Sequence, residues 1–452
     1  MRRVAPSEQA PAKRRMPQGV GTKAEAALAS DSLFPQRKTT GEGILPSQEI
    51  MDLVRTGKIL ASDEIGEDQI QPSSIDLRLG PTAYRIRASF LPRKSMTLID
   101  QARANGMLTE TIDISKGAVL EPNAIYVLPL MESLALPQDL YGIANPKSST
   151  GRLDIFTRLI TEFGDEFERV RRGYNGGLYI EVVSQTFPIL VRAGMKLNQL
   201  RFGRGRRIAV GEERLRQLGQ KDILTAPDED TTGATVDRGL RLTVDLEGNG
   251  SGIVGYRAKK TSQPIDLGLL NHYDVDDFWT PLSKTDECIL EPGEFYILAS
   301  KQRVRIPADL AAEMLPYDLS TQEFRVHYAG FFDPGFGYGE KGEIAGTRAV
   351  LEVRANEMPI LLEDNQFVGR LNYFYMAAKP EKVYGGSIGS NYQLQGLALS
   401  KQFKREQFAA PKPAGISTSR ADVDEDGPNS KSRFALNESE AAYALRAKSR
   451  TE

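Results

Sequence analysis

Short apolar segments alternate with turn residues along most of the chain. They are rich in Val, Ile, Leu and Tyr, and Pro, Gly, Asn and Asp interrupt them at close intervals. Four examples are residues 124–130, 178–183, 295–299 and 349–353. This pattern is typical of a β-sandwich or β-barrel. One helix is predicted near the start, where Ser47 can act as N-cap and Ile50 and Leu53 begin an apolar stripe. We expect an all-β fold with a few short helices.

The same pattern occurs twice. Three blocks recur with offsets of 170 or 171 residues: 120–122, 136–137 and 188–190 correspond to 290–292, 306–307 and 359–361. Glu181 and Glu352 correspond in the same alignment. Residues 75–77 also match residues 265–267, although with an offset of 190. We interpret the chain as two divergent copies of one domain, at residues 42–206 and 207–400.

The two ends depart from this pattern. Residues 1–40 carry eight Lys or Arg and three acidic residues, with little apolar periodicity. We therefore expect residues 1–41 to form a disordered basic arm. Residues 401–452 are polar and rich in Pro, Ser and Asp, so we expect a disordered tail there.

Composition and charge exclude several classes of protein. The chain has 58 Lys and Arg against 60 Asp and Glu, which argues against nucleic-acid binding. One cysteine, Cys288, excludes an intramolecular disulfide framework, and with only two histidines a zinc site is not expected. No apolar run reaches the length of a membrane span. We expect a cytoplasmic protein without a membrane or nucleic-acid partner.

Residues 145–152, NPKSSTGR, are the first candidate for chemistry. Lys147, Ser148, Ser149 and Arg152 combine an ammonium, two hydroxyls and a guanidinium beside a glycine. Such groups suit a phosphate chain, although a capped turn would also explain them.

Glu181 and Glu352 are the second candidate. Each lies in an apolar strand, GGLYIEVVS in the first copy and AVLEV in the second. A carboxylate there lies either on a solvated face or in a pocket. In a pocket its pKa is raised, and it can act as general base and acid.

Together these segments resemble the dCTP deaminase family, which belongs to the trimeric dUTPase-like β-barrel superfamily. The resemblance covers residues 42–400 and rests on IQPSSIDLRLG, SSTGR, the strand with Glu181 and AGMKLNQLRF. In the second copy, AGFFDPGFG resembles the pyrimidine-pocket hairpin and YGGSIGSNYQLQG the closing tail. It implies two tandem, distorted dUTPase-like β-barrel domains.

The resemblance also implies roles. Ser148, Ser149 and Arg152 would hold the phosphates and orient the catalytic water, with Lys147 at a position that is usually basic. Glu181 and Glu352 fall on the catalytic Glu. The remaining substrate-binding positions would be Asp333, which contacts deoxyribose, Ala329 in the same hairpin, Asp165 as its first-copy counterpart, and Tyr392 and Gln395 in the tail.

The second copy departs from the phosphate motif. Tyr317, Asp318, Leu319 and Gln322 stand where the first copy has Lys147, Ser148, Ser149 and Arg152. An Asp there would repel a triphosphate. We infer a division of labour in which the first copy holds phosphates and the second supplies other parts, and a composite site using Glu352 stays open.

The resemblance implies hydrolytic deamination of dCTP to dUTP and ammonia, which supplies dUTP for thymidylate synthesis. No metal would act at the base, and Mg²⁺ would enter on the triphosphate. It also implies a homo-oligomer with a trimer-like assembly. Three alternatives stay open: a bifunctional enzyme that gives dUMP, a dUTP diphosphatase, and a nucleotide-binding protein without activity.

Overall fold

The computed structural model describes most of the chain between residues 41 and 405. The described ranges are 41–92, 96–226, 234–248, 252–314, 324–326 (backbone only), 330–355, 357–385 and 396–405. Several positions named above lie outside these ranges: Ala329, Tyr392, Gln395 and the four second-copy residues at the phosphate motif. So do nearly all residues of the two ends that are predicted to be disordered. The described residues form one compact unit.

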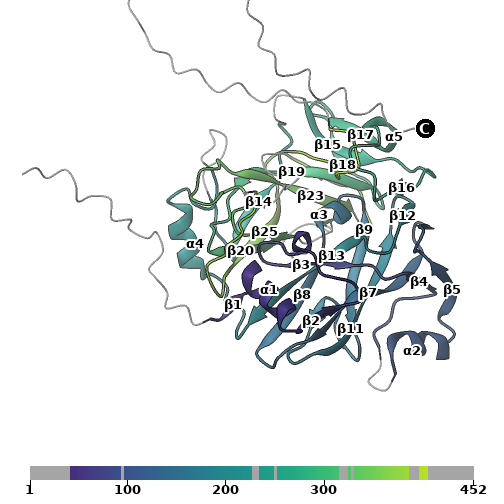
Figure 1. Ribbon diagram of the computed structural model, residues 1–452. Coiled ribbons are helices and arrows are strands. Elements are labelled where there is room, and N and C mark those ends of the chain that lie inside the picture. The colour runs from purple at the N-terminus through teal and green to yellow at the C-terminus, as the bar shows by residue number, and fades with distance from the viewer. Residues whose placement is uncertain are drawn as a thin grey trace, which may run out of the picture. The chain divides into compact units, whose positions relative to one another are not determined.

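The first half, residues 41–206, is built on two antiparallel sheets (Figure 1). One has the order β1 (Gly43–Ile44), β13 (Lys196–Arg204), β8 (Leu140–Pro146) and β10 (Arg169–Val170), with β3 (Ile75–Arg78) also on β13. The other has the order β5 (Leu108–Asp113), β4 (Thr82–Ile86), β7 (Ile125–Ala135), β11 (Asn175–Ser184) and β9 (Ile155–Thr161), with β2 (Ile59–Ala61) on β7.

The second half, residues 207–405, has two sheets of the same kind. One has the order β14 (Leu240–Thr243), β25 (Phe367–Tyr375), β20 (Leu310–Met314) and β22 (Phe331–Phe332). The other has the order β17 (Trp279–Ser283), β15 (Ile253–Ala258), β19 (Phe295–Val304), β23 (Thr347–Ala355) and β21 (Phe324–Val326). Glu181 pairs with Val127, and Glu352 pairs with Ile297, so the pairing register recurs. The predicted all-β class is confirmed.

The helices are short. They are α1 (Ser47–Arg55), the 3₁₀ turn η1 (Glu67–Gln69), α2 (Leu98–Ala104), α3 (Ser148–Gly151), α4 (Glu212–Gly219) and α5 (Val275–Phe278). The predicted first helix exists and buries Ile50 and Leu53, but Ser47 is its first residue and Pro46 its N-cap, so the predicted Ser47 cap is wrong. Among the described residues, no helix is both long and apolar enough to cross a membrane.

The match of residues 75–77 with 265–267 does not reflect equivalent strands. Ile75 pairs with Leu200 on β13, whereas Leu371 on β25 pairs with Leu240 on β14. Residues Ile265–Asp266 (β16) instead run parallel to β12 (Ile189–Val191), which also pairs with β6 (Ala118–Leu120). An edge strand leaves backbone groups open for such pairing, which short sequence matches do not reveal. The corresponding strands of the second half, β18 (Cys288–Leu290) and β24 (Ile360–Leu362), form a two-stranded sheet.

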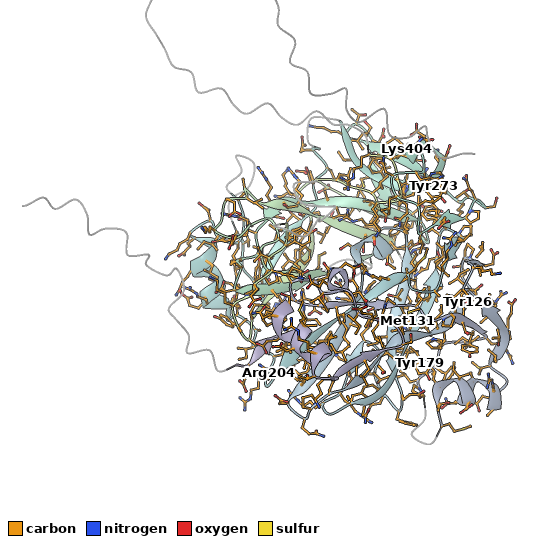
Figure 2. The ribbon with its side chains drawn as sticks, in the orientation of Figure 1. Tyr126, Met131, Tyr179, Arg204, Tyr273 and Lys404 are labelled. Atoms are coloured by element: carbon orange, nitrogen blue, oxygen red, sulfur yellow. The ribbon has the colours of Figure 1, made fainter. Side chains whose placement is uncertain are left out.

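The last described residues pack on the body of the unit. Phe403 makes edge contacts with Phe278 and Trp279 at centroid distances of 5.6 and 5.8 Å. The Lys404 backbone N–H donates to the Tyr273 carbonyl at 2.8 Å, and both residues lie together in Figure 2. This contact fixes residues 396–405 beside the elements that form the site.

Candidate functional site

The site begins at the turn formed by residues 147–152. Lys147 is extended after Pro146, and α3 follows immediately. The Thr150 hydroxyl donates to the Leu197 carbonyl at 2.9 Å, and the Ser400 hydroxyl donates to the Ser149 carbonyl at 2.8 Å. The 147–152 turn is therefore held from β13 on one side and from the C-terminal segment on the other, between β9 and β23 in Figure 1.

The two cationic side chains of this turn are differently engaged. Lys147 forms an ion pair with the buried Asp76 at 2.5 Å, and Asp76 belongs to the IQPSSIDLRLG segment. The Arg152 guanidinium donates to the Ala398 carbonyl at 3.0 Å. Both cations line the pocket described below, and both have protein partners.

Strand β23 brings Glu352 to the turn. Alternation places Arg348, Val350, Glu352 and Arg354 on one face, while the intervening residues enter the apolar core of the second half. Glu352 lies against Gly151 so closely that a Cβ added to the glycine would be 2.3 Å from the Glu352 Oε2 atom. The second half therefore places its carboxyl on the motif of the first half.

The environment of Glu352 perturbs its ionisation. Burial raises the pKa of this carboxyl from 4.5 to about 8. The Arg152 charge acts in the opposite direction, and the Asp154 charge adds to the increase. A carboxyl with such a pKa can both accept and donate a proton near neutral pH.

The hairpin with Asp333 forms another wall. Asp333 accepts hydrogen bonds from the Ser73 hydroxyl and, at 3.3 Å, from the Arg201 guanidinium. Arg201 is buried, stacks over the Phe331 ring at 4.0 Å, and donates to the Ala312 carbonyl at 3.2 Å. Two residues of the first half thus fix the orientation of a second-half carboxylate.

These elements surround one pocket, which we define by its lining. It is lined by Pro146, Lys147, Ser148, Arg152, Met314, Gly330, Phe331, Phe332, Asp333, Phe336, Arg348, Val350, Glu352, Tyr384, Gly396 and Ala398. Of the sequence candidates, the structure brings together Lys147, Ser148, Arg152, Asp333 and Glu352. Ser149 is buried in the same turn but is not part of the lining.

Glu181, which the resemblance places on the catalytic Glu, does not line this pocket. It forms an ion pair with Arg158 at 2.6 Å and is buried. Arg158 also stacks over the Phe167 ring at 3.7 Å and donates to the Ser89 hydroxyl at 2.6 Å. An apolar cluster that includes Leu98 of α2 and Tyr179 packs at this face of the sheet. In the first half, Arg158 and this apolar cluster therefore cover the Glu181 face of β11. The equivalent face of β23 in the second half lines the pocket.

The prediction that Asp165 is the first-half counterpart of Asp333 is wrong. It is exposed and does not line the pocket. Val170 pairs with Gly142 and Phe332 pairs with Ala312, so Arg171, the residue after Val170, stands where Asp333 stands. Asp165 comes earlier in a loop whose length differs between the two halves.

Sequence reasoning missed four residues that support the pocket. Ser73, Asp76 and Arg201 lie in quoted motifs but received no role, and Arg348 lies on the Glu352 face. Strand alternation from Glu352 could have found Arg348. Nothing local to the other three indicates which half they contact. Among the described residues, no group of three or more His, Cys, Asp or Glu could hold a metal ion.

The fold and its pocket define a dUTPase-like all-β protein with a site built from both halves. Family models for the 2'-deoxycytidine 5'-triphosphate deaminase N-terminal and C-terminal domains match residues 41–206 and 211–403. The chain belongs to the dCTP deaminase family.

Individual relatives agree with this family. Proteins named "dCTP deaminase, dUMP-forming" from Mycobacterium sp. (strain KMS) and Rhodococcus opacus (strain B4) are each 31% identical over 160 residues, which is 35% of this chain and 78% of the relative. A crystal structure of 2'-deoxycytidine 5'-triphosphate deaminase from Agrobacterium tumefaciens is 46% identical, with a TM-score of 0.69. That similarity covers 74% of this chain and 99% of the other.

Proposed function

We propose that the pocket deaminates dCTP by hydrolysis to dUTP and ammonia. The observation that carries this proposal is the Glu352 carboxyl, which is buried against the 147–152 turn and has its pKa raised to about 8. Water attacks C4 of the cytosine, Glu352 accepts a proton from it, and the protons then go to N3 and the leaving amine. The reaction consumes one water and releases one ammonia, and the base is converted to uracil.

The other residues position the reactants. Ser148 and Arg152 hold phosphate oxygens and align the attacking water, as hydroxyl and guanidinium donors do at developing charge. The Lys147 ammonium attracts the triphosphate, and its ion pair with Asp76 holds it in place. Asp333 accepts a hydrogen bond from the deoxyribose hydroxyl. Ser149, from the same turn, also helps to hold the phosphates.

Glu352 is the working carboxyl in this proposal. The Glu181 carboxylate is already paired with Arg158, and apolar side chains pack at its face. Glu352 faces the pocket. We therefore propose one site for each chain.

Mg²⁺ enters on the triphosphate in this proposal. Of the carboxylates lining the pocket, Asp333 is held by Ser73 and Arg201, and Glu352 is buried. The ligands of the ion are then mainly phosphate oxygens. We also propose a homo-oligomer with a trimer-like assembly, and a cytoplasmic role in supplying dUTP for thymidylate synthesis.

The test compares Glu352→Gln with Glu181→Gln. Purified protein is incubated with dCTP and Mg²⁺, and the products are separated by chromatography. We expect dUTP from the wild type, a loss of kcat of at least about 10³-fold in Glu352→Gln, and kcat within about threefold of wild type in Glu181→Gln. Loss of activity only in Glu181→Gln would contradict the assignment, and nucleotide binding without turnover would leave a non-catalytic role.

A bifunctional reaction is the second candidate, because the relatives above are named dUMP-forming. Asp333 is then the available second base, since Asp165 is exposed and outside the pocket. The same chromatography separates the two reactions: dUMP with pyrophosphate supports the bifunctional enzyme, whereas accumulating dUTP supports the deaminase alone.

A further inference from the structure

A buried ion pair joins the two halves behind the pocket. The Arg354 guanidinium forms a short ion pair with the Asp154 carboxylate, and the Thr186 hydroxyl donates to the same carboxylate at 2.5 Å. Arg354 also donates to the Gly293 carbonyl at 2.6 Å. The Asp154 side chain is fully buried, and 14% of the Arg354 side chain is exposed.

The position of this pair connects it to the site. Asp154 follows Arg152 by two residues at the end of the 147–152 turn, and its backbone N–H donates to the Gly151 carbonyl at 2.9 Å. Arg354 follows Glu352 by two residues, so both side chains project from the same face of β23. The pair therefore links the segment that carries the phosphate motif to the strand that carries the carboxyl.

We propose that Asp154 and Arg354 are positioning residues, which hold Glu352 on the 147–152 turn and balance the charge around it. This inference rests on the proposed function of Glu352. Neither residue lines the pocket, so their effect on the reaction passes through Glu352.

The charges around Glu352 explain why the balance matters. Most of the charged groups nearby are matched in pairs: Lys147 with Asp76, Arg348 with Asp245, and Asp333 with Arg201. The charges that act on the Glu352 carboxyl are Arg152, which favours its ionised form, and Asp154, which opposes ionisation. Arg354, which lies on the same strand as Glu352, pairs with Asp154 and so limits the repulsion between Asp154 and the Glu352 carboxylate.

Removing each partner should therefore move the ionisation of Glu352 in opposite directions. Asp154→Asn removes a repelling carboxylate and leaves the Arg354 cation unmatched, so the pKa of Glu352 falls. Arg354→Met removes the cation that pairs with Asp154, so the negative charge of Asp154 acts more strongly on Glu352 and the pKa of Glu352 rises. A change of about one pH unit is typical for a nearby buried charge.

The first readout is the pH profile of kcat/KM for dCTP, whose rising limb reports the ionisation of the base in free enzyme. We expect the limb to move to lower pH in Asp154→Asn and to higher pH in Arg354→Met, by about one unit each. Arg354→Lys keeps the charge and should restore the limb. Thr186→Val is the matched control, because it removes a hydroxyl from the same cluster without removing a charge.

A second readout does not depend on activity. The difference in unfolding free energy between each protein and its Glu352→Gln derivative is measured from pH 4 to 9, and its dependence on pH reports the pKa of Glu352. Shifts of opposite sign in Asp154→Asn and Arg354→Met support the inference. Shifts of the same sign, or an unchanged limb in folded Asp154→Asn, overturn it. Opposite shifts in this measurement from a protein that does not deaminate dCTP would overturn the proposed function alone.

Discussion

Replacing Gly151 by alanine tests the contact between the two halves at its tightest point. The added Cβ would lie 2.3 Å from Oε2 of Glu352 and 2.7 Å from its Cδ atom. Ordinary van der Waals contact requires about 3.4 Å or more, so the carboxyl must retreat by about 1 Å. Gly151 lies in α3 without a positive φ, so the backbone itself accepts alanine.

The expected cost falls on activity more than on stability. Alanine in a helix is favoured over glycine by about 1 kcal/mol, while overpacking costs about 1–3 kcal/mol, so the net loss of stability is about 0–2 kcal/mol. A reacting group displaced by about 1 Å can lose about 10²-fold in rate, which corresponds to about 2.7 kcal/mol of transition-state stabilisation. We therefore expect Gly151→Ala to fold normally and to lose about 10²-fold in kcat.

The assay combines dCTP turnover with thermal unfolding. Gly177→Ala is the matched control, because an added Cβ at this exposed position would meet no atom within 4 Å. It should retain kcat within about twofold, as expected of an exposed substitution. A folded Gly151→Ala protein with kcat close to that of the wild type would refute the reasoning, because Glu352 could then act from a displaced position.

Two further predictions concern stability and substrate binding. Glu352→Gln should unfold less readily than the wild type above about pH 5, because the carboxyl ionises near its ordinary pKa when unfolded but only near about 8 when folded. The stability that this carboxyl gives the wild type is therefore complete below pH 4 and declines as pH rises to about 8, by a few kcal/mol in total. A difference in unfolding free energy between the two proteins that does not change with pH, measured by denaturant titration, would contradict the raised pKa. Ser73→Ala removes the hydroxyl between Asp333 and Arg201, so we expect KM for dCTP to rise about 10-fold with little change in kcat, whereas an unchanged KM in initial-rate measurements would show that Asp333 needs no such support.

Apolar periodicity and internal matches predicted much of the fold. Ile50 and Leu53 identified α1, and the offset of about 170 residues anticipated that Glu181 and Glu352 have equivalent strand registers. Both results follow from local alternation, which the sequence displays directly. The match of residues 265–267 misled because three apolar-rich residues suit any strand edge, and the edge they join belongs to the other half.

The residue types of the candidate site were predictable, and a composite site using Glu352 was left open, but the sequence could not decide between this assembly and the alternatives. The motif at residues 147–152 and Glu352 were both identified, yet no local pattern tells which half the outer face of β23 meets. The same limitation explains why Asp165 was preferred to the register position of Arg171. Such contacts join residues about 200 positions apart, as Asp154 and Arg354 do, and only the folded chain brings them together.

The two equivalent glutamates show how packing assigns chemistry. Each sheet face must be covered, and the first half covers the Glu181 face with its own apolar residues and the Arg158 cation. The second half covers its corresponding face with the 147–152 turn, where burial opposes ionisation of Glu352 and Arg152 is countered by Asp154. The same residue type at the same strand register is thus an ion-pair partner in one half and a buried carboxyl with a raised pKa in the other, which is the group we propose as the proton acceptor. A mutation that separates the halves should therefore abolish the site even if every residue lining the pocket is retained.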